Sequence, residues 1–431
     1  MGSSSTPTIA IVGAGPSGLT LAVLLHQQGL HPTVYELRQR PSDAELSQPT
    51  GMLDLHEESG LAAIRACGLA DRFFPLTGEC AECMLVADSN GDYLHTEEPG
   101  KGRPEISRNA LTGLLLSALP ADAVQWGTKV LGAARTNTSG TGTVLRFARE
   151  AGEIASSEFD LVVGADGAWS RVRPLLTDVR PKGVGFRYAT LSIRDMAGRH
   201  PDLAEYIGPG TMMALGGPGL AIATQRTSQD SAWFFVIVPE TAMTVTGSEE
   251  NTSAATQTDV DIPFEPLALK ARLLDSDSGS GAQNFSSWGP LLKKLIATAC
   301  DEAAATTPGR PILLKAHAIL PIGHAWAPQP GVTLIGDAAH LMMPVGEGVN
   351  MGMADALELS EAIAAATAME PSAGFAEGLA PLLRDFETKM FGRTKEKAGE
   401  SWETFQMMLG EDGAGKLAAM LKGFKEQAAA A

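Results

Sequence analysis

The sequence predicts a doubly wound α/β fold that is interrupted by an antiparallel β-sheet and followed by a C-terminal helical region. Two observations predict the α/β part. A glycine-rich turn directly follows the apolar run 8–12, and a Gly-Asp turn directly follows the apolar run 332–336. The third observation is a series of short apolar runs, bounded by Gly, Pro and Asp, between residues 180 and 311, which is typical of an antiparallel sheet.

The first turn has the spacing of a dinucleotide-binding motif. The run 8–12 is short and β-branched, as in a buried parallel strand, and a helix is expected over 17–29. Gly13 permits the tight turn, Gly15 lets a pyrophosphate approach the backbone, and Gly18 lets the helix pack closely on the strand. The start of the helix adds unpaired N–H groups for the phosphates.

An acidic residue completes this unit. The next expected strand spans 31–35, and Glu36 follows it, 18 residues after Gly18. This is close to the spacing of about 20 residues at which a carboxylate binds ribose hydroxyls. The alternative is a glycine turn with an unrelated surface glutamate. The motif predicts a dinucleotide but does not separate FAD from NAD.

The second turn places an acidic residue where open α/β sheets bind ligands. Asp337 comes directly after the expected strand 332–336, at its C-terminal end. Pro344 and a Gly-x-Gly-x-Asn segment ending at Asn350 follow, and a helix is expected from there to about residue 366. A third motif, at residues 160–173, is another apolar strand followed by an Asp-Gly pair.

In this order the three motifs resemble those of the FAD-dependent aromatic hydroxylases, the class A flavin monooxygenases. In that family the aspartate of the Gly-Asp turn binds the flavin ribitol, and the following helix start faces the pyrimidine side of the ring. The Asp-Gly pair of the third motif lies near both FAD and the nicotinamide cofactor. The resemblance implies that the following residues bind the cofactor: Gly13, Gly15, Pro16, Ser17, Gly18, Glu36, Arg38, Asp166, Asp337, Pro344, Gly348, Val349 and Asn350.

Two further segments, 51–56 and 104–111, are similar to those of the tetracycline-inactivating flavin monooxygenases. In those enzymes an aspartate and an arginine of these segments touch FAD, which implies the same roles for Asp54 and Arg108. The alternatives are a loop carboxylate and a surface arginine at a helix start.

The chain also departs from these enzymes. Leu37 stands where a basic residue follows the first glutamate, and Ser47 replaces an arginine linked to NADPH use. Glu347 stands where glutamine is common, just before the expected helix. Helix N–H groups favour the negative charge of a reduced flavin by up to ~2 kcal/mol, whereas a carboxylate within ~4 Å opposes it by about 4 kcal/mol at an effective dielectric of 20. We therefore predict that Glu347 points away from the ring.

The expected division of the chain is discontinuous. Within the inserted region, strands are expected over 190–193, 211–215, 220–225 and 231–238, with polar loops over 244–258 and 276–283. Residues 233–238 are apolar on both faces, so that one face is expected to pack on helices and the other is a candidate wall of a substrate cavity. One or two helices are expected over 382–425, lying across both domains. The FAD-binding domain is expected at 1–75, 105–180 and 311–366, the substrate domain at 76–104 and 181–310, and the helical region at 367–431.

The composition limits the binding partners and the cellular location that we expect. The 33 Lys and Arg against 50 Asp and Glu give a net charge of −17, which argues against nucleic acid or an anionic membrane as a partner. We find no apolar run of ~18 residues and no signal peptide, so we expect a cytoplasmic protein, and a monomer.

Four cysteines do not make a disulfide framework for a chain of 431 residues. Cys80 and Cys83 have the spacing of a redox pair, but buried, incidental thiols are the favoured interpretation.

The resemblance implies an FAD-dependent monooxygenase. NADPH or NADH would visit transiently to reduce FAD, O2 would add at the flavin C4a, and the hydroperoxide would pass one oxygen to a polycyclic or phenolic, polyketide-like or tetracycline-like substrate. The cofactor carries the difficult step, so no catalytic side-chain set and no metal are expected. A flavin oxidase or Baeyer–Villiger enzyme would share every motif, and a non-catalytic FAD-fold binding protein is the alternative from another class. The Trp-x-Trp-x-Ile-Pro segment of flavin halogenases is not found in the sequence.

Overall fold

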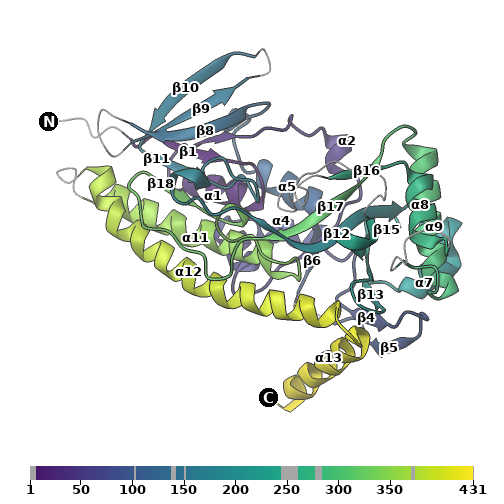
Figure 1. Cartoon of the computed structure of the whole chain (residues 1–431). Helices are drawn as coiled ribbons and strands as arrows, with labels where there is room; N and C mark the ends of the chain where they lie inside the picture. The colour runs from purple at the N-terminus through teal and green to yellow at the C-terminus, as the bar shows by residue number, and fades with distance from the viewer. Residues whose placement is uncertain are drawn as a thin grey trace.

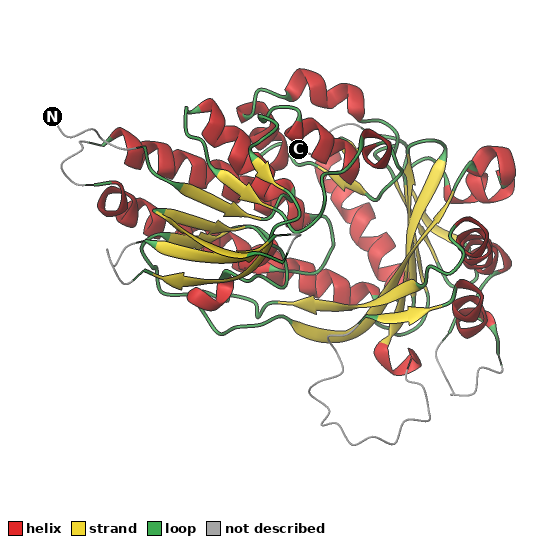
Figure 2. Cartoon of the chain, turned by 90° about the horizontal axis from the view of Figure 1, so that it is seen from above, coloured by secondary structure: helices red, strands yellow, loops and turns green. Residues whose placement is uncertain are grey.

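The computed structural model describes residues 6–100, 103–136, 142–149, 152–243, 261–276, 284–369 and 374–430. Two sheets with their own helices lie side by side, and the long helix α12 (Phe375–Met408) runs past both of them (Figures 1 and 2). The first half of α12 packs into the core of the first sheet through Leu383 and Phe386, and its end packs on the second sheet through Phe405 and Met408. The expected C-terminal helical region is therefore present and connects the two sheets.

The first sheet is the expected parallel sheet of a doubly wound fold. Its five strands are ordered β18-β11-β1-β2-β7, and every pair is parallel. β1 (Ile9–Val12) and β11 (Leu161–Gly164) are buried along their whole length, as expected for central strands covered on both faces. The other strands are β2 (Thr33–Tyr35), β7 (Val124–Gln125) and β18 (Val332–Leu334).

Helices cover one face of this sheet and a small antiparallel sheet packs on the other. α1 (Pro16–Gln27) and α11 (Glu347–Ala368) contact each other on the helical side, with α3 (Gly60–Ala66) and α5 (Arg108–Leu116) beside them. The small sheet consists of β8 (Lys129–Arg135), β9 (Thr143–Ala148) and β10 (Ile154–Phe159). It packs through Phe147, whose ring stacks on Tyr35 with centroids 5.1 Å apart. No motif in the sequence had indicated this sheet.

The second sheet is the expected antiparallel sheet, with one parallel pair. Its eight strands are ordered β16-β17-β12-β15-β14-β13-β4-β5, and only β13 and β4 run parallel. One face is covered by α6 (Met196–Arg199), α7 (Pro201–Ile207), α8 (Pro266–Leu274) and α9 (Pro290–Thr306), which share a buried core with the strands. Figure 1 labels α7, α8 and α9 beside this sheet. The strands are β4 (Met84–Ala87), β5 (Tyr93–Thr96), β12 (Lys182–Ile193), β13 (Thr211–Leu215), β14 (Ala221–Thr227), β15 (Ser231–Pro239), β16 (Ile262–Phe264) and β17 (Ile312–Ile319).

Short elements complete the chain. β3 (Met52–Asp54) and β6 (Glu105–Ser107) pair as a two-stranded antiparallel sheet. The remaining helices are α2 (Asp43–Leu46), α4 (Ala70–Phe73), α6 (Met196–Arg199), α7 (Pro201–Ile207), α8 (Pro266–Leu274), α9 (Pro290–Thr306), α10 (Asp337–His340) and α13 (Gly413–Ala430), with 3₁₀ turns at Phe74–Leu76, Arg173–Leu175 and Glu240–Met243.

Several boundaries differ from the expectation. β17 pairs with β12 and β16 in the second sheet, although the sequence placed residues 311–366 in the FAD-binding domain. We therefore propose that this segment rejoins the first domain only after β17. α11 begins at Glu347 rather than at Asn350, and α12 begins at Phe375 and contains Pro381. The polar loop expected over 244–258 lies outside the described residues, as does all of the loop 276–283 except its first residue.

None of the helices in the described ranges is both long enough and apolar enough to span a lipid bilayer.

Two neighbouring phenylalanines on opposite faces of β15 test which face belongs to the buried core. Phe234 is fully buried against the helices, and the next residue, Phe235, is half-buried on the opposite face. We expect Phe234→Ala to lower the free energy of unfolding by about 3–5 kcal/mol. Phe235→Ala should cost about 1–2 kcal/mol, because less apolar surface is lost. Urea unfolding of the apoprotein measures both, and equal losses would contradict the assignment of the two faces.

Candidate active site

The glycine turn between β1 and α1 leaves open space at one position only. Gly13 has a φ of +106°, and a Cβ there would lie 2.3 Å from the Ala165 carbonyl oxygen. A Cβ on Gly18 would lie 2.1 Å from the Gly13 carbonyl oxygen, so strand and helix meet backbone to backbone. At Gly15, by contrast, the built Cβ has no atom of the described residues within 4 Å apart from its neighbours along the chain. This open space lies at the N-terminus of α1, where a phosphate can approach.

Pro16 and Ser17 begin α1 but do not have the same surroundings. Pro16 is in the first turn of the helix, where its missing N–H costs nothing. The Ser17 hydroxyl lies 2.6 Å from a Cβ built on Gly336 and 2.2 Å from one built on Gly352. Ser17 therefore packs against the Gly-Asp turn and α11, and its role at the cofactor stays a prediction.

Glu36 lies at the C-terminal end of β2, beside the glycine turn. Its Oε2 accepts a hydrogen bond from the Ala14 N–H at 2.8 Å, and its Oε1 accepts from Nε of Arg38 at 2.9 Å. Burial raises the pKa of Glu36, but the hydrogen bonds from Arg38 and Ala14 outweigh burial and lower it. The carboxylate is thus held ionised next to the turn. Arg38, expected at the cofactor, is 70% exposed and pairs with Glu36.

The Gly-Asp turn after β18 is held by a buried carboxylate that the motifs did not indicate. Asp355 of α11 is fully buried. Its Oδ2 accepts from the Gly336 N–H at 3.0 Å and contacts Nε2 of His340, while Oδ1 accepts from Arg393 of α12 at 2.8 Å. Burial lowers the pKa of His340, but the charge of Asp355 outweighs burial and raises it. Asp355 and Arg393 thus position the turn that carries Asp337.

The start of α11 lies next to Asp337. Gly346, the N-cap, has a φ of +101° and no capping side chain, so the N–H groups of Glu347, Gly348 and Val349 have no partner within the helix. The Asp337 Oδ1 lies 3.9 Å from a Cβ built on Gly348. Asp337 itself is exposed, as is Pro344 in the loop that leads into α11. The two parts of the second motif therefore meet here.

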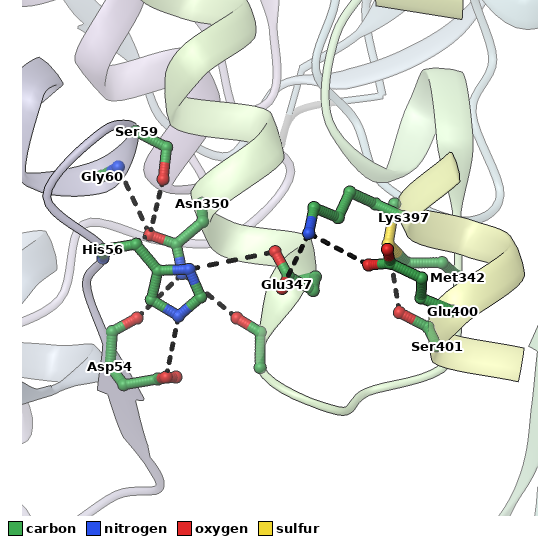
Figure 3. A network of polar contacts seen from close by, with 11 residues as sticks. Asp54, His56, Ser59, Gly60, Met342, Glu347, Asn350, Lys397, Glu400 and Ser401 are labelled. Carbon is green, nitrogen blue, oxygen red and sulfur yellow. Dashed lines mark hydrogen bonds and ion pairs between the residues drawn. The ribbon is translucent and has the colours of Figure 1, made fainter. Parts of the chain in front are cut away.

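Asn350 is fully buried and its side chain is occupied by protein groups (Figure 3). Its Nδ2 donates to the Asp54 carbonyl at 2.9 Å and to the Gly346 carbonyl at 3.1 Å. Its Oδ1 accepts from the His56 N–H at 2.9 Å and from the Ser59 hydroxyl and the Gly60 N–H, both at 3.3 Å. The side chain therefore fixes the loop after β3 to the start of α11, and a contact of Asn350 with the cofactor stays a prediction.

The loop after β3 brings several ionisable groups to this helix start. Nε2 of His56 lies 3.0 Å from Asp54 Oδ2, and Nδ1 lies 3.9 Å from Glu347 Oε2. Glu347 Oε1 lies 3.8 Å from Nζ of Lys397 on α12 (Figure 3). Glu105 is paired with Asp54 across β3 and β6. Burial, with smaller contributions from Asp54 and Glu82, raises the pKa of Glu105 to about 7.

Arg108 begins α5, and its backbone N–H donates to the Gly51 carbonyl at 3.1 Å. Its guanidinium forms no hydrogen bond or ion pair with the residues that the structure describes. The side chain is exposed, yet surrounding protein desolvates it enough to lower its pKa, which Asp337 and Tyr188 counteract. This combination is expected for a cation in the wall of a recess.

The third motif is the loop after β11, which also reaches the Gly-Asp turn. Asp166 accepts from the Arg171 N–H at 2.6 Å through Oδ2, while its Oδ1 is buried without a partner among the described residues. Burial raises the pKa of Asp166. Arg173, also buried, donates from Nε to the Ala338 carbonyl at 2.9 Å and so ties this loop to α10. The sequence gave no sign of that contact.

These features fit an FAD molecule. Among the residues that the structure describes, it provides an open approach at Gly15, N–H groups without a partner at the start of α11, an unpaired Arg108 and a buried Asp166 oxygen without a partner. Bound FAD would be held by the glycine turn and Glu36 at one end and by Asp337 and the start of α11 at the other. The four cysteines are buried and free, and burial raises the pKa of each thiol, consistent with incidental thiols.

A parallel sheet with these three turns at one edge defines an FAD-binding oxidoreductase, and comparison with known proteins agrees. A family model described as "FAD binding domain" matches residues 5–261 and 327–373. Monooxygenase penA of Penicillium thymicola is 36% identical over 438 residues, covering 96% of this chain and 98% of the relative. Monooxygenase asqM of Emericella nidulans is 33% identical over 442 residues, with the same coverage. The chain belongs to the FAD-dependent monooxygenases.

The fold is also found in solved structures. HpxO of Klebsiella pneumoniae, solved with FAD and uric acid, superposes with a TM-score of 0.68 at 21% identity, covering 96% of this chain and 92% of that one. Because the chain belongs to a family of enzymes, it is an enzyme and not the non-catalytic FAD-fold binding protein considered above. The closer likeness to the tetracycline-inactivating enzymes stays a prediction.

Substitutions at two glycines of the first turn test folding and cofactor binding separately. We expect Gly18→Ala to destabilise the apoprotein by about 1–3 kcal/mol, because the added methyl clashes with the Gly13 carbonyl. Gly15→Ala should leave the apoprotein within about 0.5 kcal/mol of the wild type. It should weaken FAD binding by at least about tenfold, since the methyl fills the open space. Unfolding curves and FAD titration test this, and unchanged FAD affinity in Gly15→Ala would contradict it.

The raised pKa of Glu105 predicts a pH dependence of stability. The unfolded chain loses this proton near pH 4.5, whereas the folded chain holds it up to about 7. Stability should therefore fall as pH rises from about 4.5 to 7, by at most about 3 kcal/mol. Glu105→Gln should remove this decline and be the more stable protein at pH 8, and the exposed Glu98→Gln is the control. Parallel stability–pH curves for wild type and Glu105→Gln would refute the prediction.

Proposed function

We propose that this protein uses NADPH or NADH and O2 to hydroxylate a planar aromatic small molecule. The observation that carries the proposal is the position of an aromatic face of the second sheet next to the elements that would hold the flavin. Trp233 of β15 lies 3.3 Å from a Cβ built on Gly51, directly before β3, and the Met52 N–H donates to Gln225 of β14 at 3.1 Å. The sheet thus adjoins the loop that carries Asp54.

Bound FAD supplies the electron transfer and the activation of oxygen, so the protein's part is to orient, to stabilise charge and to exclude water. The unpartnered N–H groups of Glu347, Gly348 and Val349 favour negative charge at the start of α11. Glu36 would accept hydrogen bonds from the hydroxyls of the adenosine ribose, and Asp337 would accept them from the ribityl chain. Arg108 adds a positive charge near Asp337.

The proposed substrate wall is the half-buried face of the second sheet, opposite the helices. Tyr188 of β12 lies over His317 of β17 with ring centroids 4.4 Å apart, and its ring is 6.0 Å from Phe235 of β15. Phe405 of α12 approaches His317 edge-on at 5.5 Å. Burial lowers the pKa of His317 to about 4, so the imidazole is neutral near pH 7. Such a wall suits a flat aromatic ring, which stacks on aromatic side chains.

The relatives support this substrate class in general terms. HpxO binds uric acid, a flat heteroaromatic molecule, in the structure with which this chain superposes. Polycyclic, phenolic and polyketide-like compounds remain the proposed candidates. In the tetracycline-inactivating enzymes an arginine linked to NADPH use stands where this chain has Ser47. NADPH and NADH are therefore both candidate reductants.

The test is anaerobic reduction followed by product analysis. The purified protein should show the absorption of oxidised flavin, and NADPH or NADH should bleach it, faster in the presence of one member of a panel of phenolic and heteroaromatic compounds. After ¹⁸O2 is admitted, that compound should gain one labelled oxygen on a ring carbon. Hydrogen peroxide without labelled product would identify an oxidase. Label inserted as a ring-expanding ester would identify a Baeyer–Villiger enzyme, and either result would overturn the proposal.

A further inference from the structure

We propose that Lys397, on the C-terminal helix α12, is a positioning residue for Glu347. It balances the charge of this carboxylate at the start of α11 and holds it off the flavin, and so sets the reduction potential of the bound FAD. The proposal rests on the placement of the flavin at the start of α11 proposed above, and it is independent of the reductant and the substrate.

Glu347 is a carboxylate at the helix start that would hold the negatively charged reduced flavin. It is the first residue of α11, beside N–H groups that favour a negative charge on a neighbouring group. A carboxylate turned toward the flavin would oppose the charge that reduction adds to the ring. In the structure its two oxygens are directed instead to Lys397 at 3.8 Å and to His56 at 3.9 Å (Figure 3). Its side chain is only 20% exposed, so water screens it incompletely.

Lys397 has the position and the charge that this role requires. It extends from α12, near the end that packs on the second sheet, and is 34% exposed. Its Nζ also lies 3.0 Å from Glu400, one helical turn further on. The hydrogen bond to Glu400 is the largest cause of a raised pKa, and the charge of Glu347 adds to it, so the ammonium group stays charged.

The surroundings offer no other full positive charge to Glu347 among the ion pairs of the described residues. Its second partner, His56, is buried between Glu347 and Asp54, and Glu105 lies across from Asp54. This end of α11 is therefore rich in carboxylates, with Lys397 as the cation that contacts Glu347. Removing Lys397 would leave the Glu347 charge uncompensated beside the proposed flavin site.

The experiment is a double-mutant cycle read out as the two-electron reduction potential of bound FAD. It compares wild type, Lys397→Met, Glu347→Gln and the double variant, each equilibrated anaerobically with a reference dye. We expect Lys397→Met to disfavour reduction about tenfold, a shift of about −30 mV. Glu347→Gln should stay within about threefold of the wild type, because the carboxylate is already held away from the flavin. The double variant should return to the Glu347→Gln value.

Two controls separate this role from a general effect of charge or folding. Lys395→Met removes the same charge two residues away, where the side chain is exposed and contacts Gly323, and should leave the potential unchanged. Lys397→Arg should restore the wild-type potential. FAD affinity and the unfolding curve of each variant show whether the flavin site is intact.

The outcomes separate this proposal from the proposed function. A wild-type potential in Lys397→Met, or a double variant as low as Lys397→Met alone, would overturn the role of Lys397 and leave the monooxygenase proposal standing. A potential raised well above the wild type in Glu347→Gln would show that the carboxylate already faces the flavin, which also overturns it. A failure to oxygenate any compound, with the expected potentials, would overturn only the proposed function.

Discussion

The site depends on one constraint, the adjacency of β18, β11 and β1 in a parallel sheet. Parallel register aligns their C-terminal ends, with Val12 opposite Gly164 and Gly164 opposite Leu334. Three turns that are far apart in the sequence therefore lie at one sheet edge, where open α/β folds bind ligands. The strands are so closely packed at Gly164 that a side chain does not fit there, since a Cβ on Gly164 would lie 2.6 Å from the Leu334 side chain.

Two buried polar side chains of α11 fix the segments at this sheet edge relative to one another. Asp355 ties the Gly-Asp turn to α12, and Asn350 ties the loop after β3 to the helix start. Both are fully buried, and buried polar groups must be satisfied or they cost free energy. Because each is satisfied by groups from distant segments, the segments have little freedom to move relative to α11. The C-terminal helix α12 thereby takes part in the site through Arg393 and Lys397.

The sequence predicted the parts of the fold that rest on local patterns. The strand, glycine turn and helix of the first motif, the Asp337 turn and the antiparallel insertion all lie where the patterns placed them, because backbone sterics and side-chain periodicity act over a few residues. The three-stranded sheet packed on Tyr35 and the pairing of β17 were not predicted. Both depend on which distant strand is nearest, and periodicity carries no information about that.

The functional features also divide into those that the sequence predicted and those that only the structure revealed. From the sequence by itself, the glycines and acidic residues at these spacings predicted a bound dinucleotide, because such a motif binds one wherever it folds. The resemblance of the three ordered motifs to the class A flavin monooxygenases then implied FAD and an oxidoreductase. Only the tertiary structure decided that the Asn350 side chain is a clamp, that Asp355 and Arg393 hold the Asp337 turn, and that Glu347 lies between His56 and Lys397. The physical reason is that a polar side chain takes its role from the partners that folding brings within about 3–4 Å, and those partners lie on other elements.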